Sequence, residues 1–262
     1  MPFGLKNAGT TFQWAISYCF HDLAHIILAY LEDLTTRSKH RVQHLHDLRT
    51  IFLRCRKYNI RLNPLKCVFC VPAGRLLGFI VSKDGITLDP LKVQAILELP
   101  IPRTLRQLQS LQGKANFLRR FVPDYATTAH GFLRLLRSNI PFVWDTYAHE
   151  SFDALKQALT SAPLIRPPDF DRDFILYISA STYSVAGVLI QEDDNGIEHV
   201  IYYVSKNLVG PPVSYSYEEK LALAVVFSVQ KLRHYILMLS TKVVTNSNPM
   251  AFLLSRRILT GK

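Results

Sequence analysis

The sequence predicts an α+β protein, because stretches with the periodicity of an amphipathic helix alternate with short stretches of strand character. Two helical stretches flank a short strand pair near the start of the chain. After residue 170 the order is strand, turn, strand, long helix and strand. The chain has 262 residues, of which 48% are hydrophobic, so it has enough apolar material for one large domain or two small ones.

The first helix and the carboxylate pair that follows it are predicted from the spacing of apolar residues. From Thr10 to Leu28 these residues recur at intervals of three and four, which indicates one amphipathic helix. The next segment, Ala29–Leu34, reads AYLEDL and places Glu32 and Asp33 in an apolar run. Burial of two adjacent carboxylates is costly unless a metal ion or another charge compensates them, so this turn between two strands is a candidate metal site. A second helix is predicted over His40–Tyr58.

A β-hairpin is predicted next, with strands over residues 67–71 and 76–81 and a turn at Pro72–Gly74. Cys67 and Cys70 have the spacing of a zinc-binding pair. No second pair accompanies them, so we interpret them as two small apolar residues of the hairpin.

A basic helical region follows the hairpin. Asp89 is predicted to cap a helix that begins at Pro90, and helical structure broken by prolines extends to about Leu136. The cations of this region are Arg103, Arg106, Lys114, Arg119, Arg120, Arg134 and Arg137, with Asp124 as the main acid. These side chains either belong to an ordinary solvated helix surface or contact the phosphates of a nucleic acid. The formal charge of +11 over the whole chain favours a polyanionic partner without proving one.

A separate α+β unit is predicted after a proline-marked linker at residues 163–168. Strand character extends over Phe174–Gln191 and His199–Ser205. A long helix is predicted over Tyr217–Leu239 and a further strand over Lys242–Thr245.

Several segments together resemble the Pol polyprotein of long-terminal-repeat retrotransposons of the Ty3/gypsy type. They occur in the order of that family and cover nearly the whole chain. The matching segments are Met1–Ala8 with Thr11–Gln13 (base of the palm helix), Tyr30–Asp33 (the tyrosine-x-aspartate-aspartate metal hairpin), Leu62–Cys67 and Leu77–Ser82 (palm turn and primer grip), Leu108–Phe121 (thumb), and Ile175–Leu189 and Tyr215–Tyr235 (ribonuclease H).

The resemblance implies three parts: a partial reverse transcriptase palm over residues 1–88, a thumb-like helical region over 89–145, and a C-terminally truncated ribonuclease H-like α/β domain over 146–262. It also implies RNA-directed DNA synthesis and RNA-strand hydrolysis by two-metal catalysis with Mg²⁺ or Mn²⁺, and RNA, DNA or an RNA–DNA hybrid as partner. The positions implied to contact nucleic acid are Phe3, Gly4, Gln13, Lys66, Gly78, Arg103, Arg106, Lys114, Arg119 and Arg120.

The polymerase site departs from the family pattern. The family has a catalytic aspartate upstream of the Met-Pro-Phe-Gly segment, and this chain begins at Met1. Glu32 stands where the first aspartate of the hairpin is expected. Its extra methylene displaces the carboxylate by about 1 Å, whereas Mg²⁺ requires near-octahedral ligands at roughly 2.0 to 2.1 Å. Asp33 alone would be a weak metal ligand and is not expected to hold two ions.

The ribonuclease H site departs further. Ser179, Leu221 and Asn246 stand where the family has an aspartate, a glutamate and an aspartate. Glu218 and Glu219 lie on the same predicted helix, but one neighbouring carboxylate leaves the site short of negative charge. We therefore expect neither activity and no retained metal ion.

Three alternatives stay open: a basic protein that binds nucleic acid without catalysis, a scaffold partner of an intact polymerase from a related element, and residual enzyme activity. Other chemistry has weaker support. His21 and His25 have no third metal ligand near them, and Ser179 and Ser181 have no histidine to activate them. No apolar run approaches the roughly 18 residues that span a bilayer, and no secretory leader is recognised. A soluble protein of the cytoplasm or nucleus, without membrane contact, is expected.

Overall fold

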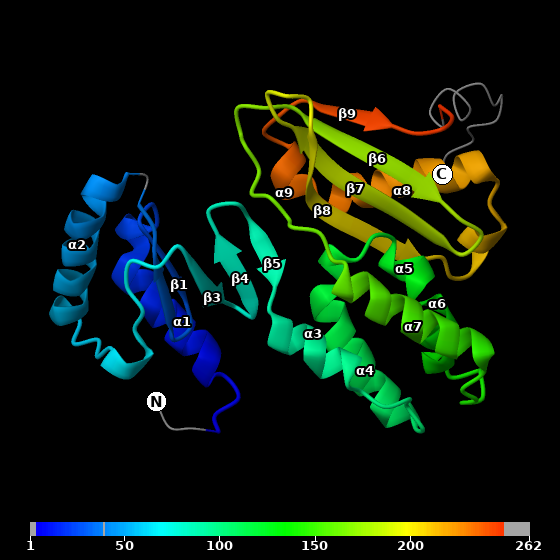
Figure 1. The fold of residues 1–262 in the computed structure, drawn as a ribbon, viewed down its shortest axis with the longest axis horizontal. Helices are drawn as coiled ribbons and strands as arrows, with labels where there is room; N and C mark the ends of the chain where they lie inside the picture. Colours follow the sequence, from blue (N-terminus) through cyan, green and yellow to red (C-terminus); the bar gives the residue numbers. More distant parts are fainter. Residues whose placement is uncertain (1–3, 39, 249–262) are drawn as a thin grey trace. The chain divides into compact units, whose positions relative to one another are not determined.

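The computed structural model describes residues 4–38 and 40–248. The chain divides into two compact units, Met1–Leu76 and Leu77–Lys262. Each unit combines helices with antiparallel strands (Figure 1), which confirms the predicted α+β class.

The first unit consists of two helices and a two-stranded hairpin. Its elements are α1 (Ala8–Phe20), a 3₁₀ turn (His21–Leu23), β1 (Ile27–Tyr30), β2 (Asp33–Thr36), a 3₁₀ turn (Arg41–Gln43), α2 (His44–Lys57), a 3₁₀ turn (Pro64–Lys66) and β3 (Ala73–Leu76). Its core contains Ile16, Cys19, Phe20, Leu23, Ile26, Ile27, Ile51 and Cys55.

The helix predicted over His40–Tyr58 is confirmed, but the one predicted over Thr10–Leu28 is too long. The α-helix ends at Phe20, and Ile27 and Leu28 belong to strand β1. Ile27 is buried and Leu28 exposed, which is the alternation of a strand. The apolar spacing of a helix therefore continued by coincidence into a strand.

The first part of the second unit is a hairpin followed by a helical region. The elements are β4 (Phe79–Ser82), β5 (Ile86–Leu88), α3 (Pro90–Leu97), α4 (Leu105–Leu118), a 3₁₀ turn (Arg119–Phe121), α5 (Tyr125–Thr128), α6 (His130–Leu133), a 3₁₀ turn (Arg134–Leu136) and α7 (Thr146–Thr160). Asp89 caps α3 as predicted, since its side chain accepts a hydrogen bond from Leu91 N at 3.0 Å.

The predicted hairpin at residues 67–81 is wrong in its first strand and in its turn, because Ala73 and Gly74 belong to a strand. Residues 67–71 form no strand, and Cys70 has a left-handed backbone with φ +55°. The strands instead occupy Ala73–Leu76 and Phe79–Ser82. The alternating run CVFCV has strand propensity, but propensity alone makes no strand where no partner pairs with it.

Helix α7 was not predicted, yet it is central to the packing of this unit. Its buried residues Phe152, Leu155 and Leu159 share one apolar cluster with residues of α4 and α6. The two helices approach closely at Gly131 of α6, whose backbone N–H donates to Ser151 Oγ at 3.1 Å. Only glycine fits there, because a Cβ at position 131 would overlap Ser151 Oγ and the carbonyl oxygen of Tyr147.

The rest of the second unit is a four-stranded sheet with helices on one face. The elements are β6 (Phe174–Ala180), β7 (Ser184–Glu192), β8 (Glu198–Asn207), a 3₁₀ turn (Pro211–Ser214), α8 (Tyr217–Lys231), α9 (Arg233–Ile236) and β9 (Thr241–Val244). The strand order is β8-β7-β6-β9, with β9 parallel to β6 and the other pairs antiparallel. The strand character over Phe174–Gln191 is thus two strands, β6 and β7.

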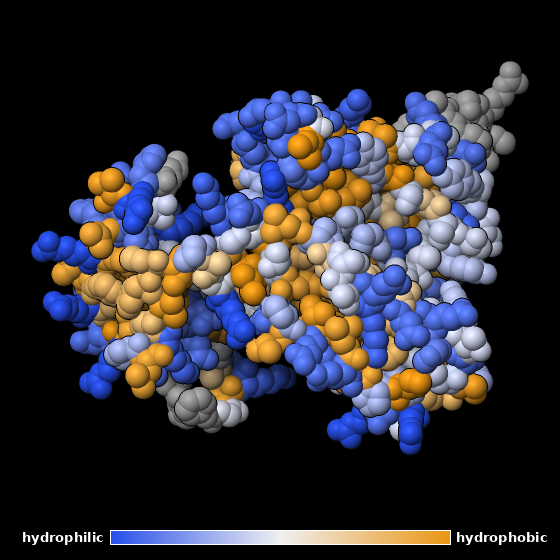
Figure 2. Space-filling model, viewed as in Figure 1, coloured by the Kyte–Doolittle hydropathy of each residue, from blue (hydrophilic) through white to orange (hydrophobic). Residues whose placement is uncertain are grey.

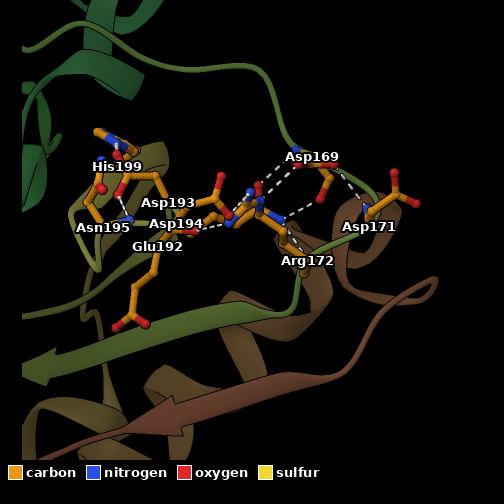
Figure 3. Close-up of polar contacts among 9 residues, drawn as sticks. Asp169, Asp171, Arg172, Glu192, Asp193, Asp194, Asn195 and His199 are labelled. Atoms are coloured by element: carbon orange, nitrogen blue, oxygen red, sulfur yellow. Dashed lines mark hydrogen bonds and ion pairs between the residues drawn. The ribbon is translucent and has the colours of Figure 1, made fainter.

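A polar cluster holds the linker before β6 against the turn between β7 and β8 (Figure 3). The side chain of buried Gln191 accepts from Asp169 N and donates to the carbonyl oxygens of Asp169 and Arg172. Arg172 pairs in turn with Asp169 at 3.0 Å and Asp194 at 2.6 Å. His199 Nε2 lies 2.9 Å from Asp193 Oδ2 and, with the backbone N–H groups of the turn, lowers the pKa of Asp193 to about 2.

Within the described residues, no helix has both the length and the apolar character needed to cross a membrane.

Candidate metal and nucleic-acid sites

The carboxylate pair lies at the tip of the β1–β2 hairpin. Tyr30 and Asp33 face each other in the antiparallel register, so the turn consists of Leu31 and Glu32. Leu31 has φ +49°, a left-handed backbone that two-residue hairpin turns favour. Glu32 and Asp33 are both exposed to solvent rather than buried in an apolar environment.

Gln13 supports this turn from helix α1. Its Oε1 accepts a hydrogen bond from Leu31 N at 2.6 Å, and its Nε2 donates to Ala29 O at 3.2 Å and to Ser17 Oγ at 3.1 Å. Gln13 is one of the positions that the family resemblance implies to contact nucleic acid. In the structure its amide is engaged by the hairpin, so its immediate role is to position the backbone that carries Glu32 and Asp33.

These carboxylates do not fit a two-metal site. Across residues 4–38 and 40–248, no three His, Cys, Asp or Glu side chains gather where they could hold a metal ion. In that part of the chain Glu32 and Asp33 therefore have no third metal-ligating side chain beside them, and neither the Cys67–Cys70 pair nor the His21–His25 pair belongs to a group of three that could hold a metal ion. Two divalent ions require carboxylates from separate strands, which this hairpin does not supply.

The ribonuclease H positions are arranged as follows. The last registered pair of the parallel strands β6 and β9 is Tyr177 with Val244, and Ser179 and Asn246 each lie two residues beyond it. Both are exposed. Leu221 on α8 is 0% exposed and packs with Leu176 and other residues of the apolar cluster beneath the sheet.

This arrangement supplies a hydroxyl, an amide and a hydrocarbon where a divalent ion would need carboxylate oxygens, so it does not fit the metal ions of this chemistry. Glu219, an acid close in sequence to Leu221, has a structural role. Glu219 completes a capping box, because its carboxylate accepts from Ser216 N at 2.8 Å while the Ser216 hydroxyl accepts from Glu219 N. Its position at the start of α8 is therefore explained by helix capping.

The predicted cationic positions differ in exposure. Arg103, Arg106, Lys114 and Arg119 are exposed, and Arg106 and Lys114 lie on α4 outside its buried stripe. Arg119 also donates to Asn116 Oδ1 at 3.3 Å. The four side chains can reach a polyanion without losing buried contacts.

Arg120 is half-buried instead. Its guanidinium carbon lies 4.0 Å from the centre of the Phe79 ring and 5.3 Å from that of Phe121. The Phe117 ring also stacks on Phe79, with ring centroids 4.7 Å apart. The packing of Arg120 against the Phe79 and Phe121 rings, with Phe117 stacked on Phe79, was not predicted, although three of these four residues are close in sequence.

The remaining predicted contacts lie at turns. Gly78 has φ +77°, and a Cβ there would lie 3.0 Å from the Phe117 ring, so both backbone and packing require glycine. Lys66 and Gly4 are exposed. Phe3 lies outside the described residues.

The fold is that of a reverse transcriptase segment followed by a ribonuclease H-like module. Residues 1–81 match the family described as reverse transcriptase (RNA-dependent DNA polymerase), and residues 144–244 match the RNase H-like domain found in reverse transcriptase. Both families generally work with divalent metal ions.

The chain resembles retrotransposon Pol polyproteins of the Ty3/gypsy type, in agreement with the expectation from its sequence. It is 33% identical over 275 residues to the Retrovirus-related Pol polyprotein from transposon opus of Drosophila melanogaster, covering 100% of this chain and 27% of that protein. Identity to the corresponding polyprotein from transposon 297 is 32%, covering 97% and 24%. The Transposon Tf2-3 polyprotein of Schizosaccharomyces pombe is 26% identical, covering 90% and 18%. The chain thus spans about a quarter of the length of the two Drosophila relatives.

The fold is also that of a solved viral enzyme. The foamy viral protease-reverse transcriptase in complex with dsDNA superposes with a TM-score of 0.84 at 20% sequence identity, covering 100% of this chain and 55% of that one. The predicted fold, a reverse transcriptase palm and helical thumb followed by a ribonuclease H-like module, is therefore confirmed.

Proposed function

We propose that this chain catalyses neither DNA synthesis nor RNA hydrolysis and instead binds the backbone of an RNA, DNA or RNA–DNA duplex. In this proposal residues 1–88, 89–145 and 146–262 correspond to palm, thumb and ribonuclease H-like parts, and the thumb-like part makes the contacts. The observation that carries the loss of catalysis is Leu221, which is 0% exposed in an apolar cluster where the family has a glutamate.

Loss of the acids is more damaging than loss of a single catalytic group. In two-metal catalysis the carboxylates hold the ions that stabilise both the attacking and the leaving oxygen. Ser179 and Asn246 also lack a negative charge, so all three positions are affected. No step through a bound metal is therefore assigned to this chain.

Duplex binding is supported by charge and exposure. Arg103, Arg106, Lys114 and Arg119 present four exposed cations in and around α4, on a chain with a formal charge of +11. Phosphate contacts of this kind position a protein on a duplex without reading its sequence. The structural neighbours include foamy viral reverse transcriptase complexes with dsDNA and with an RNA/DNA hybrid.

Salt dependence of binding tests the proposal. If all four cations neutralise phosphates, log K falls with log salt with a slope of about −3.6 for duplex DNA. The measurement is fluorescence anisotropy of a labelled RNA–DNA hybrid and of a DNA duplex over a range of salt. We expect the double variant Arg106→Gln/Lys114→Gln to bind more weakly and to reduce the slope by about 2.

The matched control is Arg166→Gln/Lys242→Gln, which removes the same charge at two exposed positions far along the chain from α4. It should keep the slope near that of the parent protein. An equal loss of duplex affinity in both double variants would mean that binding depends on the total charge of the protein and not on the position of the cations. No binding at low salt would refute the proposal and favour the scaffold alternative.

A further inference from the structure

Helix α1 presents two large aromatic side chains to solvent. Trp14 is 79% exposed and Tyr18 is 68% exposed. They are four residues apart and therefore neighbours on the helix surface, whereas Ile16, Cys19 and Phe20 of the same helix are buried in the core. Tryptophan is highly buried on average in folded proteins, and contiguous exposed apolar surface, unlike a single exposed ring, marks a binding site.

Further rings continue this surface. The Tyr18 ring stacks against His21, with centroids 6.1 Å apart and an interplanar angle of 25°. It also makes an edge contact with Tyr58, at 6.3 Å and 78°. We call Trp14, Tyr18, His21 and Tyr58 the aromatic stripe. Trp14 and Tyr18 come from α1, His21 from the 3₁₀ turn that follows it, and Tyr58 is the C-cap of α2.

An ion pair fixes the two parts of the stripe. Arg54 of α2 donates from Nη1 and Nη2 to the two carboxylate oxygens of Asp22 at 2.6 and 2.7 Å, and from Nη1 to Cys19 O at 2.9 Å. These hydrogen bonds hold the pKa of Asp22 well below its ordinary value. The carboxylate next to the stripe is thus compensated and opposes a polyanion less than a free one would.

Uncompensated cations border the stripe on the side of α2. Lys57 Nζ lies 5.5 Å from the centre of the Tyr58 ring. Lys57 and its neighbour Arg56 are exposed, and in the described part of the chain neither forms an ion pair with a carboxylate. Beside them, a hollow of about 260 Å³ is lined by Thr50, Leu53, Arg54 and Lys57.

The whole first unit, like the border of the stripe, carries a net positive charge. Met1–Leu76 contains 11 Lys and Arg against four Asp and Glu. Figure 2 shows apolar side chains interspersed with strongly hydrophilic ones on the visible face of this unit. A polyanion with flat apolar groups matches this combination better than an acidic or purely apolar peptide does.

We propose that the aromatic stripe is a stacking platform for unpaired nucleotides of single-stranded RNA or DNA. Bases stack on Trp14 and Tyr18, and Arg56 and Lys57 pair with phosphates. Every base has a π face, so such a platform tolerates any sequence. This site lies on α1 and α2 and is independent of the cations proposed for duplex binding on α4.

The first test measures affinity for labelled oligo(dT) and oligo(U) by fluorescence anisotropy. Trp14→Ala and Tyr18→Ala should each weaken binding by about 5- to 150-fold, the range expected for one stacked base. Trp14→Phe keeps an aromatic face and should lose less than Trp14→Ala. The matched control is Leu65→Ala, at a 96% exposed position in the same unit outside the stripe, and it should bind like the parent protein.

The second test uses the two tryptophans of the chain as internal reporters. Trp144 packs against Phe132 and Phe152, and its Nε1 is buried, so it is shielded from bases. In a Trp144→Phe protein, where Trp14 is the remaining tryptophan, oligo(dT) should quench the emission. In a Trp14→Phe protein the emission should not change.

Unchanged affinity in Trp14→Ala together with unquenched Trp14 emission would overturn the platform. So would concentration-dependent self-association that Trp14→Ala abolishes without any oligonucleotide effect, since the stripe would then be a contact between protein chains. Binding of the RNA–DNA hybrid should be unaffected by Trp14→Ala, whereas the α4 double variant should weaken it. Failure of the platform is thereby separated from failure of the duplex site.

Discussion

Replacement of Gly131 by alanine tests the packing of α6 against α7 most sharply. A Cβ at this position would overlap Ser151 Oγ and Tyr147 O and would lie 2.9 Å from the Tyr147 carbonyl carbon. Overpacking of this kind costs about 1 to 3 kcal/mol. Displacement of Ser151 also weakens its hydrogen bond with Gly131 N, worth about 0.5 to 1.5 kcal/mol. We expect a loss of about 2 to 4 kcal/mol in the free energy of unfolding.

The matched control is Gly113→Ala in α4. Nothing lies within 4 Å of a Cβ at Gly113, and alanine stabilises a helix interior by roughly 0.5 to 1 kcal/mol relative to glycine. The same substitution should therefore have opposite signs at the two positions. In a unit of this size each kcal/mol shifts Tm by about 2 to 4 °C, so Gly131→Ala should lower Tm by about 4 to 16 °C and Gly113→Ala should raise it slightly.

Urea and thermal unfolding followed by circular dichroism measure both effects. Purified variants should be compared under identical buffer and protein concentration, because irreversible aggregation would turn Tm into a kinetic quantity. A Gly131→Ala protein as stable as the Gly113→Ala protein would refute the close crossing of α6 and α7.

Two further predictions concern the ribonuclease H-like part. Leu221→Glu restores the family's residue type but places a carboxylate in an apolar cluster. It should lower the free energy of unfolding, measured in urea, by on the order of several kcal/mol. Val226→Glu, at an exposed position of α8, is the control and should change this free energy by no more than about 0.5 kcal/mol. Since the pKa of Asp193 is lowered to about 2, its contribution to stability is complete above the unfolded-state pKa near 3.9 and is lost as the pH falls toward 2. Asp193→Asn should therefore flatten the fall of Tm between about pH 4 and 2, and Glu192→Gln should not; parallel curves for all three proteins would contradict this role of Asp193.

Much of the fold was predictable because local signals and tertiary contacts agree. Helix α2 combines an apolar side with basic residues in its last turn, and Asp89 with Pro90 marks the start of α3. The metal-type hairpin was predicted from its sequence alone. The support of this hairpin by Gln13 was not predicted, because the two hydrogen bonds join Gln13 to residues that lie 16 and 18 positions away in the sequence.

The errors have separate physical causes. Helix α7 has a clear signal, with Asp145 as its cap and Phe152, Leu155 and Leu159 at helical spacing, but it begins at the boundary expected between the thumb-like and ribonuclease H-like parts. The strand predicted at 67–71 failed because strand formation depends on a partner that local sequence does not reveal. At the ribonuclease H site the sequence identified the changed residues, but only the structure shows that Leu221 is fully buried.

The central claim, binding without catalysis, is tested most directly by activity assays on purified protein. Primer extension on poly(rA)·oligo(dT) and cleavage of a labelled RNA–DNA hybrid should be measured with Mg²⁺ and with Mn²⁺, beside an Asp33→Ala control, at concentrations where hybrid binding is demonstrated. The account predicts bound hybrid, no incorporation above the control and no cleaved RNA. Incorporation that depends on Asp33, or metal-dependent cleavage of the RNA strand, would contradict it.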